Sequence, residues 1–461
     1  MLISQKSALV GQQKVHQYVE NSCTDDFLNV LVGPELISVV EALQPEHRER
    51  IYTPSVTLAM FITQALSTDR SCQKAVDEFA VKRIAQGLPR ISSRTGAFCM
   101  ARQRLPVEMI SSLSSHVADL MIPYIKDDWK FNGFNTFIVD GFTVKMPDTP
   151  ENQAAYPQEP GQKPGLGSPI CRSVVITSLE TAATIDVATA PYSGKGTGES
   201  ALLRKMLNNF NKGDLMLGDA LFASYFLLAE LFNMGVHFLF EQMSGRSGKA
   251  NFKSGEKLGA KDHIIVLTKP KKKPQWMDQE TYDKAPDSLK VREFKSGGKV
   301  MTTSLLLPNE APKKDLSDHY KKRWNVELDI RNIKTTMKME TLSCKTPEMV
   351  EKEMWVYFLA YNIIRLLILQ SALMCGVLPR QISYKHTIQM WLPWCLMNAK
   401  QCIEKRHDLF LLIAQQLVGN RPGRIEPRAL KMRPKAYPLL TKPRAEARAD
   451  VRKNGHPKKT K

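Results

Sequence analysis

The sequence predicts an α/β protein built on a mixed β-sheet, and three observations support this prediction. Between about residues 135 and 240, β-rich runs and helical stretches follow one another as three strands, a helix, a strand, a helix and a strand. Two of these strands end at an aspartate. Helical periodicity dominates the chain before residue 125 and after residue 338. With 461 residues, of which 43% are hydrophobic, the chain has room for two to four domains and a sizeable core.

The charge balance points to a polyanionic partner. Lysine and arginine number 65 against 46 aspartates and glutamates, which gives a net charge of +19. Nucleic acid fits this charge best, and an anionic membrane surface is the alternative. The most apolar stretch, residues 355–378, is interrupted by Arg365 and Gln370, so we expect a buried core helix and no membrane span. The eight cysteines include no C-x-x-C pair, which favours reduced thiols over disulfides or a zinc site.

The region 1–125 is predicted to be mostly helical. A helix over about residues 93–105 carries Arg102 and Arg104, and Pro106 opens the next helix. A helix, a turn and a basic helix are compatible with a helix-turn-helix-like DNA reader, although many other helical domains share the pattern. Arg102 and Arg104 are therefore candidate DNA contacts.

Two acids follow predicted strands. The β-rich run 137–139 ends at Asp140, and a short strand over 214–217 is followed by Asp219. An aspartate at the end of a buried strand is a common position for a catalytic carboxylate. Aspartates beside glycine in turns without any function are commoner still, so the pattern alone leaves both interpretations open.

The remaining elements are shorter or less regular. Residues 148–167 are rich in proline, glycine, asparagine and glutamine and are predicted to form a loop. Further strands are expected at 171–176, 183–190, 236–240, 264–268, 289–294 and 300–307, and helices at 199–210 and 223–234. Asp262 and His263 are expected to be a structural pair, because no further ligand spacing supports a metal site. The tail from residue 419 holds 14 lysines and arginines against 3 acids and is expected to be extended or disordered and to contact DNA backbone, with a solubilising tail as the alternative.

Residues 320–334 form the most informative stretch. At about 100° per residue, one helical sector of roughly 60° holds four polar side chains. They are Tyr320, Arg323, Glu327 and Lys334. An adjoining apolar stripe is made of Val326, Ile330, Ile333 and Met337. One acid among three donors suits a metal ion beside phosphates, and a solvated charged face is the alternative.

The spacing Y-x2-R-x3-E-x6-K of these four residues resembles the signature of the insertion sequence 4 family of transposases, which are DDE enzymes. Shorter phrases at 64–67, 101–106 and 421–428 resemble the same family, and the resemblance extends over about residues 50–445. It implies a ribonuclease H-like catalytic core interrupted by a β-rich insertion, with helical N-terminal and C-terminal regions. In that fold the first and fourth strands are neighbours, which would bring Asp140 and Asp219 together.

The resemblance also implies a division of the chain. The expected parts are a helical DNA-binding region (1–125), the first part of the core (126–240), the β-rich insertion (241–307), the second part of the core with the signature helix (308–345), a helical region (346–418) and a basic tail (419–461).

The same resemblance assigns chemistry to the acids. Phosphodiester cleavage by two Mg²⁺ (or Mn²⁺) ions about 4 Å apart activates a water and stabilises the leaving 3′ oxygen. Asp140 is the expected shared ligand, and Asp219 and Glu327 would each complete one ion. Other residues would hold DNA: Tyr320, Arg323 and Lys334 through phosphates, and Trp276 by stacking on a base flipped out of the duplex. The alternative for Trp276 is a packed or surface-anchoring side chain.

The implied function is transposition of an insertion sequence. Helices before residue 125 would bind the terminal inverted repeats of double-stranded DNA, and the acids would cut one strand with water. The freed 3′ hydroxyl would form a hairpin on the opposite strand, a second water would open it, and the 3′ end would join target DNA. A homodimer pairing two ends is expected, in a bacterial cytoplasm at the nucleoid and away from membranes. A nuclease that cuts without joining and a non-catalytic DNA-binding derivative remain the alternatives.

Overall fold

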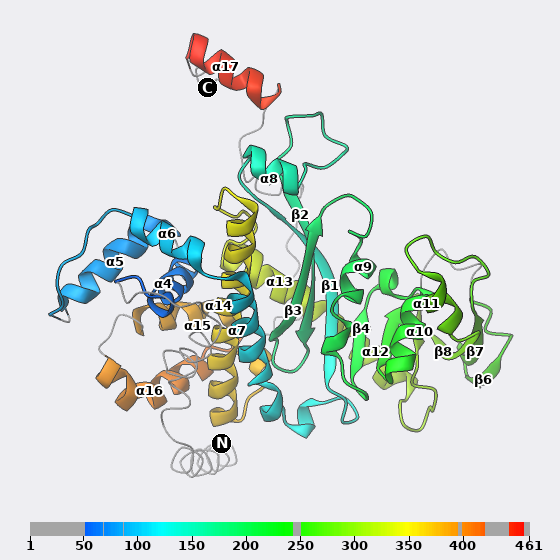
Figure 1. Cartoon of the computed structure of the whole chain (residues 1–461). Helices are drawn as coiled ribbons and strands as arrows, with labels where there is room; N and C mark the ends of the chain where they lie inside the picture. The colour runs from blue at the N-terminus through cyan, green and yellow to red at the C-terminus, as the bar shows by residue number, and fades with distance from the viewer. Residues whose placement is uncertain are drawn as a thin grey trace, which may run out of the picture.

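A mixed nine-stranded sheet forms the centre of the computed structural model, which describes residues 51–67, 69–85, 87–242, 250–394, 399–419 and 442–455 (Figure 1). The strand order is β3-β2-β1-β4-β5-β9-β8-β7-β6. The strands are β1 (Thr136–Lys145), β2 (Ile170–Ser178), β3 (Thr184–Pro191), β4 (Leu215–Gly218), β5 (His237–Glu241), β6 (Glu256–Gly259), β7 (Asp262–Thr268), β8 (Ser288–Ser296) and β9 (Lys299–Thr303). β1, β4 and β5 run parallel, and the other neighbours are antiparallel. The α/β class is therefore confirmed.

Strand β1 is longer than the sequence predicted. Asp140 does not end it: antiparallel pairing with β2 continues to Lys145, since alternate side chains such as Val144 remain buried in the core. Parallel pairing with β4 stops earlier, at Ile138 opposite Leu217. Asp140 therefore lies two residues past the last β1–β4 pair, where the sheet opens.

In Figure 1 the central helix α14 (Pro347–Cys375) lies between the sheet on one side and α4, α5, α6, α15 and α16 on the other. The α-helices before it are α4 (Pro54–Leu66), α5 (Cys72–Ala85), α6 (Gly96–Arg104), α7 (Val107–Asp119), α8 (Pro150–Ala155), α9 (Glu199–Arg204), α10 (Tyr225–Met234), α11 (Gln279–Lys284), α12 (Lys313–Lys321) and α13 (Asn325–Arg331). Those after it are α15 (Tyr384–Trp394), α16 (Ala399–Ala414) and α17 (Arg444–Asn454). The helical character expected before residue 125 and after residue 345 is confirmed where the structure describes the chain. Residues 1–50 and the phrase at 421–428 lie outside the described residues.

Helix α14 is the core of the molecule. It packs against α7, α4, α15 and α16, and its side chains join those of the sheet in one hydrophobic cluster. The helix is long and apolar enough to cross a membrane, but 89% of its most apolar window is buried inside the protein. The packing therefore supports the expected buried core helix.

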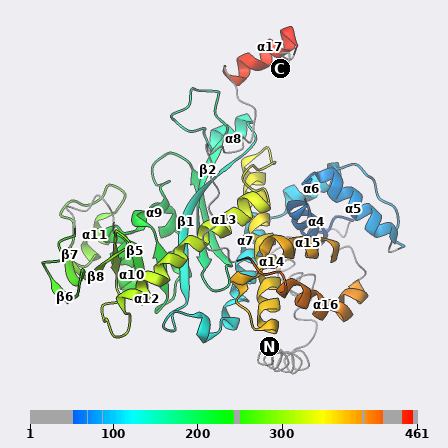
Figure 2. The same cartoon turned by 180° about the vertical axis from the view of Figure 1, so that it is seen from behind.

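The signature segment is not one regular α-helix. α12 passes into a 3₁₀ turn (Lys322–Trp324), then α13, then a π-helical turn (Asn332–Thr336), and the whole segment runs across β1 (Figure 2). A 3₁₀ turn has fewer residues per turn than an α-helix, and a π turn has more. The rotations that they add to the side-chain positions around the helix axis therefore offset one another. The predicted apolar stripe stays on the core: Val326, Ile333 and Met337 are buried, and Ile330 packs against the same cluster.

The β-rich insertion extends the central sheet. Its last strand, β9, pairs antiparallel with β5, and β8, β7 and β6 follow outward. The sequence did not predict β6 or α11. Asp262 forms a buried ion pair with Arg292 (2.6 Å), and His263 bonds the Ser254 carbonyl through Nδ1 (2.7 Å). Each residue therefore has a structural partner, but the two do not pair with one another as expected.

Three other predictions need correction. The expected loop 148–167 contains α8, which Thr149 caps and Pro150 begins, both favourable choices at a helix start. The helix expected over 199–210 ends as α-helix at Arg204 and continues only as a 3₁₀ turn (Leu207–Asn209). The tail is not wholly extended, because α17 is helical.

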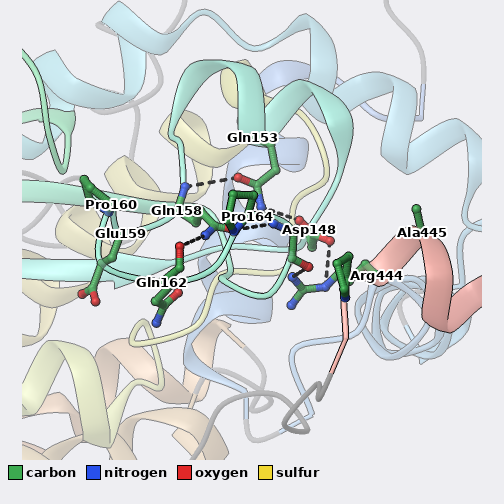
Figure 3. Close-up of a pocket in the computed structure, with 11 residues that line it drawn as sticks. Asp148, Gln153, Gln158, Glu159, Pro160, Gln162, Pro164, Arg444 and Ala445 are labelled. Carbon is green, nitrogen blue, oxygen red and sulfur yellow. Dashed lines mark hydrogen bonds and ion pairs between the residues drawn. The ribbon is translucent and has the colours of Figure 1, made fainter.

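The start of α17 is fixed to the loop around α8. Arg444 forms an ion pair with Asp148 (2.7 Å) and donates to the Gly167 carbonyl (2.8 Å), while its backbone amide donates to the Gly165 carbonyl (3.1 Å). A cavity opens between this segment and the loop (Figure 3). Gln158 and Gln162 are among its lining residues, and none of the acids described next is among them, so the cavity is separate from those acids.

Candidate active site

Asp140 and Asp219 lie close together just past the point where β1 and β4 stop pairing, as the strand order predicted. This end of the β1–β4 pair is called the acid edge below. Asp219 follows β4 directly, and its Oδ1 accepts a hydrogen bond from the Leu221 amide (2.9 Å). Asp140 accepts one from the Gly141 amide through Oδ1 (2.8 Å). Burial raises the pKa of Asp140 to about 6, and the negative charge of Asp219 adds to the rise. The two carboxylates are therefore close enough to repel one another.

Arg323 connects this pair to the third acid. Its guanidinium lies 3.6 Å from Oδ2 of Asp140 and 3.5 Å from Oε1 of Glu327. The Arg323 and Asp140 side chains are 18% and 19% exposed, whereas Glu327 is 38% exposed, so the acids line a surface that a ligand can reach. The structure thus brings Asp140, Asp219 and Glu327 to one place, with a cation between two of them.

Tyr320 supports the strand that carries Asp219. Its hydroxyl donates to the Gly218 carbonyl (3.2 Å), and burial raises its pKa to about 12, so it remains a donor at neutral pH. Gly218 itself packs tightly, since a Cβ there would lie 3.0 Å from Phe222. In this structure Tyr320 therefore positions the end of β4.

Lys334 lies further along the sheet. It is partly buried in the π turn, and its positive charge lowers the pKa of Cys171 on β2, although burial of the thiol raises that pKa overall. In the β1–β2 register Cys171 pairs with Val144, four residues beyond Asp140. Lys334 is thus placed near Cys171, beside the β1–β2 pair.

An ion-pair network anchors the helix that carries Glu327. Asp329, two residues later, is 2% exposed and contacts Arg365 of α14 (3.0 Å) and Arg380 (3.0 Å). Arg380 also donates to the Ser178 carbonyl at the end of β2 (2.9 Å). This network ties the signature segment to α14 and to the sheet. From the sequence only one more acid in the segment is visible, which does not predict the network.

Glu199, which no sequence pattern singles out, also lies at the acid edge. A Cβ built on Gly141 would fall 2.6 Å from its Oε1, and its charge contributes to the raised pKa of Asp140. A glutamate opening a helix after a glycine-rich loop carries no signal that could have identified it.

Trp276 is half exposed at 49%, and one of its faces is already covered. The Arg204 guanidinium lies 3.9 Å from the ring centroid, and Phe226 contacts the ring edge-on. Arg204 is fixed by an ion pair with Glu230 (2.9 Å). A base stacking on Trp276 would have to use the other face or displace Arg204.

The two candidate arginines of α6 differ in their surroundings. Arg102 is 8% exposed, its guanidinium lies over the rings of Phe61 (4.7 Å) and Phe98 (5.3 Å), and it bonds Gln64. Arg102 is therefore withdrawn as a candidate DNA contact, because a side chain packed between aromatic rings in the core does not reach DNA. Arg104 is exposed and remains a candidate.

The acids fit a hard divalent cation by their chemistry. Among the described residues, no three acidic, histidine or cysteine side chains lie close enough together to enclose one ion. Carboxylate oxygens are nevertheless the ligands that Mg²⁺ prefers, and it retains several waters of its own. The charges of Asp219 and Glu199 act on Asp140, and Arg323 links Asp140 to Glu327. The result is an excess of negative charge that a divalent cation would neutralise.

Comparisons with known proteins indicate the family of this chain. Residues 132–363 match the family model described as the transposase DDE domain, a span that includes all three acids. The transposase InsG for insertion sequence element IS4 of Escherichia coli (strain K12) is 29% identical over 366 residues, covering 75% of this chain and 78% of that protein. The putative transposase InsZ of the same strain is 32% identical over 113 residues, 24% of this chain and 36% of that protein.

One solved structure, a cryo-electron microscopy structure of the piggyBac transposase synaptic complex with hairpin DNA, matches 87% of this chain and 86% of its own. Its sequence identity is 11% and its TM-score is 0.44, a similarity too low to support an argument. The match to the family model and the similarity to InsG are sufficient to assign the family. The chain therefore belongs to the insertion sequence 4 family of DDE transposases, enzymes that cleave and transfer DNA.

Proposed function

We propose that this transposase cuts both DNA strands at the ends of its element through a hairpin intermediate and then joins the 3′ ends to target DNA. The observation that carries the proposal is the meeting of Asp140 and Asp219 at the open edge of β1 and β4, with Glu327 linked to them through Arg323. The β3-β2-β1-β4-β5 half of the sheet, with its parallel β1, β4 and β5, supports a ribonuclease H-like core.

Asp140, Asp219 and Glu327 would hold two Mg²⁺ or Mn²⁺ ions, with Asp140 shared between them. When bound, the ions supply an activated water and a stabilised leaving oxygen. The chain's own contribution is to fix the acids: the Gly141 amide orients Asp140, the Leu221 amide orients Asp219, and the Asp329 network holds the helix of Glu327.

Arg323 would exchange its carboxylate partners for the scissile phosphate when DNA binds. Its two ion pairs are long, 3.5 and 3.6 Å, and guanidinium groups bind phosphate in the same forked manner as carboxylate. Lys334 would contact the phosphate backbone of the DNA further from the cut. Tyr320 would hold the end of β4, and with it Asp219, in place. Such contacts position the DNA without reading its sequence.

The outer parts of the chain would recognise DNA and pair the ends. We propose the division into the six parts given above, with exposed Arg104 and the N-terminal helices on the terminal repeats. Trp276 would stack on a flipped base beside the cut, and the basic tail would contact the backbone. Two copies would form the synaptic complex in the bacterial cytoplasm, at the nucleoid.

A denaturing gel of DNA products tests this proposal. Purified protein is incubated with duplex DNA carrying the element's ends and Mg²⁺. A nick that matures into a strand of doubled length supports the hairpin route, and joined products support strand transfer. Nicks without hairpins or joining would replace the proposal with a simple nuclease, and binding without cleavage in Mg²⁺ or Mn²⁺ would replace it with a DNA-binding derivative.

A further inference from the structure

Glu199 lies at the catalytic edge although neither the signature nor the strand pattern includes it. It is the first residue of α9, and its carboxylate packs over the backbone of Gly141. A Cβ built on Gly141 would lie 2.6 and 2.7 Å from its two oxygens. Because Gly141 directly follows Asp140, the absence of a side chain there leaves the space that Glu199 fills.

The charges around Glu199 place it near both aspartates. Its negative charge acts on Asp140, and the charge of Asp219, after burial, raises the pKa of Glu199 itself. The cation that acts on it is Arg172, which stacks on Tyr192 and donates to a loop carbonyl. Within the part of the chain that the structure describes, the partly buried Glu199 carboxylate forms no hydrogen bond and no ion pair.

A purely structural role would be to stabilise the start of α9, since an acid in the first turn interacts favourably with a helix N-terminus. An acid in the first turn can stabilise the helix in this way even when its side chain is exposed to solvent. Glu151 in the first turn of α8, also six residues long, is such an exposed acid. Glu199 instead points inward, against the backbone that carries Asp140.

We propose that Glu199 is a fourth carboxylate of the metal-binding centre and a ligand on the side formed by Asp140 and Asp219. This rests on the proposed function, because it presumes that these acids bind divalent cations. The centre would then be asymmetric: three carboxylates converge from β1, β4 and α9, whereas Glu327 reaches it from the signature helix.

Binding of Mn²⁺ to the full chain tests the assignment without relying on activity. The loss of the free Mn²⁺ electron paramagnetic resonance signal is titrated for the wild type and for three variants, Glu199→Gln, Asp219→Asn and the matched control Glu151→Gln. Glu199→Gln is expected to raise the Kd for Mn²⁺ about tenfold or more, in the range found when groups supporting a metal site are removed. Asp219→Asn is expected to do the same, and Glu151→Gln to leave the Kd unchanged. Melting temperatures without metal identify any variant that fails to fold.

The three variants distinguish a failure of the Glu199 assignment from a failure of the proposed function. If Glu199→Gln binds Mn²⁺ like the wild type while Asp219→Asn binds it more weakly, Glu199 is not a ligand and the proposed function stands. If Glu199→Gln and Glu151→Gln weaken binding equally, the effect of Glu199 is one of helix stability and the assignment is overturned. If Asp219→Asn binds like the wild type, both this inference and the metal site of the proposed function are wrong.

Discussion

At the scale of single residues, the site depends on charges held close together by backbone donors. Asp140 and Asp219 each accept a backbone amide hydrogen bond, and Arg323 spans the distance between Asp140 and Glu327. Each carboxylate is thus oriented before any metal or DNA arrives. Preorganised groups of this kind need no rearrangement at the moment of reaction.

Glu180, at the turn after β2, predicts a pH dependence of stability. It is 6% exposed, accepts hydrogen bonds from the Thr136 amide and the Ser178 hydroxyl, and burial raises its pKa to about 7 from 4.5. Between these pH values the unfolded chain loses this proton while the folded chain keeps it, so Glu180 destabilises the fold increasingly as pH rises.

Glu180→Gln should therefore gain stability relative to the wild type, and the gain should be larger at pH 8 than at pH 5 by about 2 kcal/mol. Denaturant unfolding at both pH values measures it, with exposed Glu151→Gln as the control. An equal effect of Glu180→Gln at the two pH values would show that the carboxyl is not held protonated.

Arg104 and Arg102 make a matched pair for DNA binding. Exposed Arg104 is expected to contribute one phosphate contact, so Arg104→Ala should weaken binding to DNA ends and reduce the slope of log affinity against log salt by about 1. Arg102→Met should leave that slope unchanged, because Arg102 is packed between Phe61 and Phe98. A salt slope that Arg104→Ala does not alter would remove this residue from the interface.

At the scale of elements, the regular patterns were predictable and the departures from them were not. The strand and helix order around Asp140 and Asp219 followed from β-rich runs and helical periodicity, and the buried stripe with Val326 followed from helical periodicity. The 3₁₀ and π turns of the signature segment did not, since they respond to tertiary contacts such as the Asp329 network. Glu199 was missed for the same reason: its contact with Gly141 joins residues 58 positions apart, and no local pattern encodes it.

The Asp329 network predicts the stability of the signature segment. Asp329→Asn would leave the buried guanidinium of Arg365 and the partly buried guanidinium of Arg380 without their carboxylate, at a cost of about 3–5 kcal/mol. Asp318→Asn is the control on the same segment, because its ion pair with Lys321 is exposed and such pairs contribute little. Thermal or denaturant unfolding measures both, and equal stabilities of the two variants would contradict the role given to the network.

At the scale of the whole molecule, one sheet carries both the acids and the insertion. β9 extends the sheet from β5, so Trp276 and the acids belong to one continuous framework. The tail returns to this framework through Arg444, which holds the start of α17 against the loop around α8. The sequence predicted the positive charge of the tail but not this attachment, which depends on a carboxylate at Asp148, nearly 300 positions away.

The attachment of the tail can be measured by hydrogen–deuterium exchange. Arg444→Gln removes the ion pair with Asp148, so amides of α17 should exchange faster than in the wild type. Arg448→Gln, on the exposed side of the same helix, should leave exchange unchanged. Equal exchange in the wild type and Arg444→Gln would mean that Arg444 does not hold the segment.

The central claim is that the acids at the β1–β4 edge bind the ions that support cleavage, and a change of ligand tests it most directly. In Asp219→Cys the soft thiolate replaces a hard carboxylate, which Mg²⁺ tolerates poorly and Mn²⁺ accepts better. Cleavage of DNA ends by this variant should fall about 100-fold or more in Mg²⁺ and recover substantially in Mn²⁺, while Asp219→Ala recovers in neither. Cleavage by Asp219→Cys at the wild-type rate in Mg²⁺ would contradict the account.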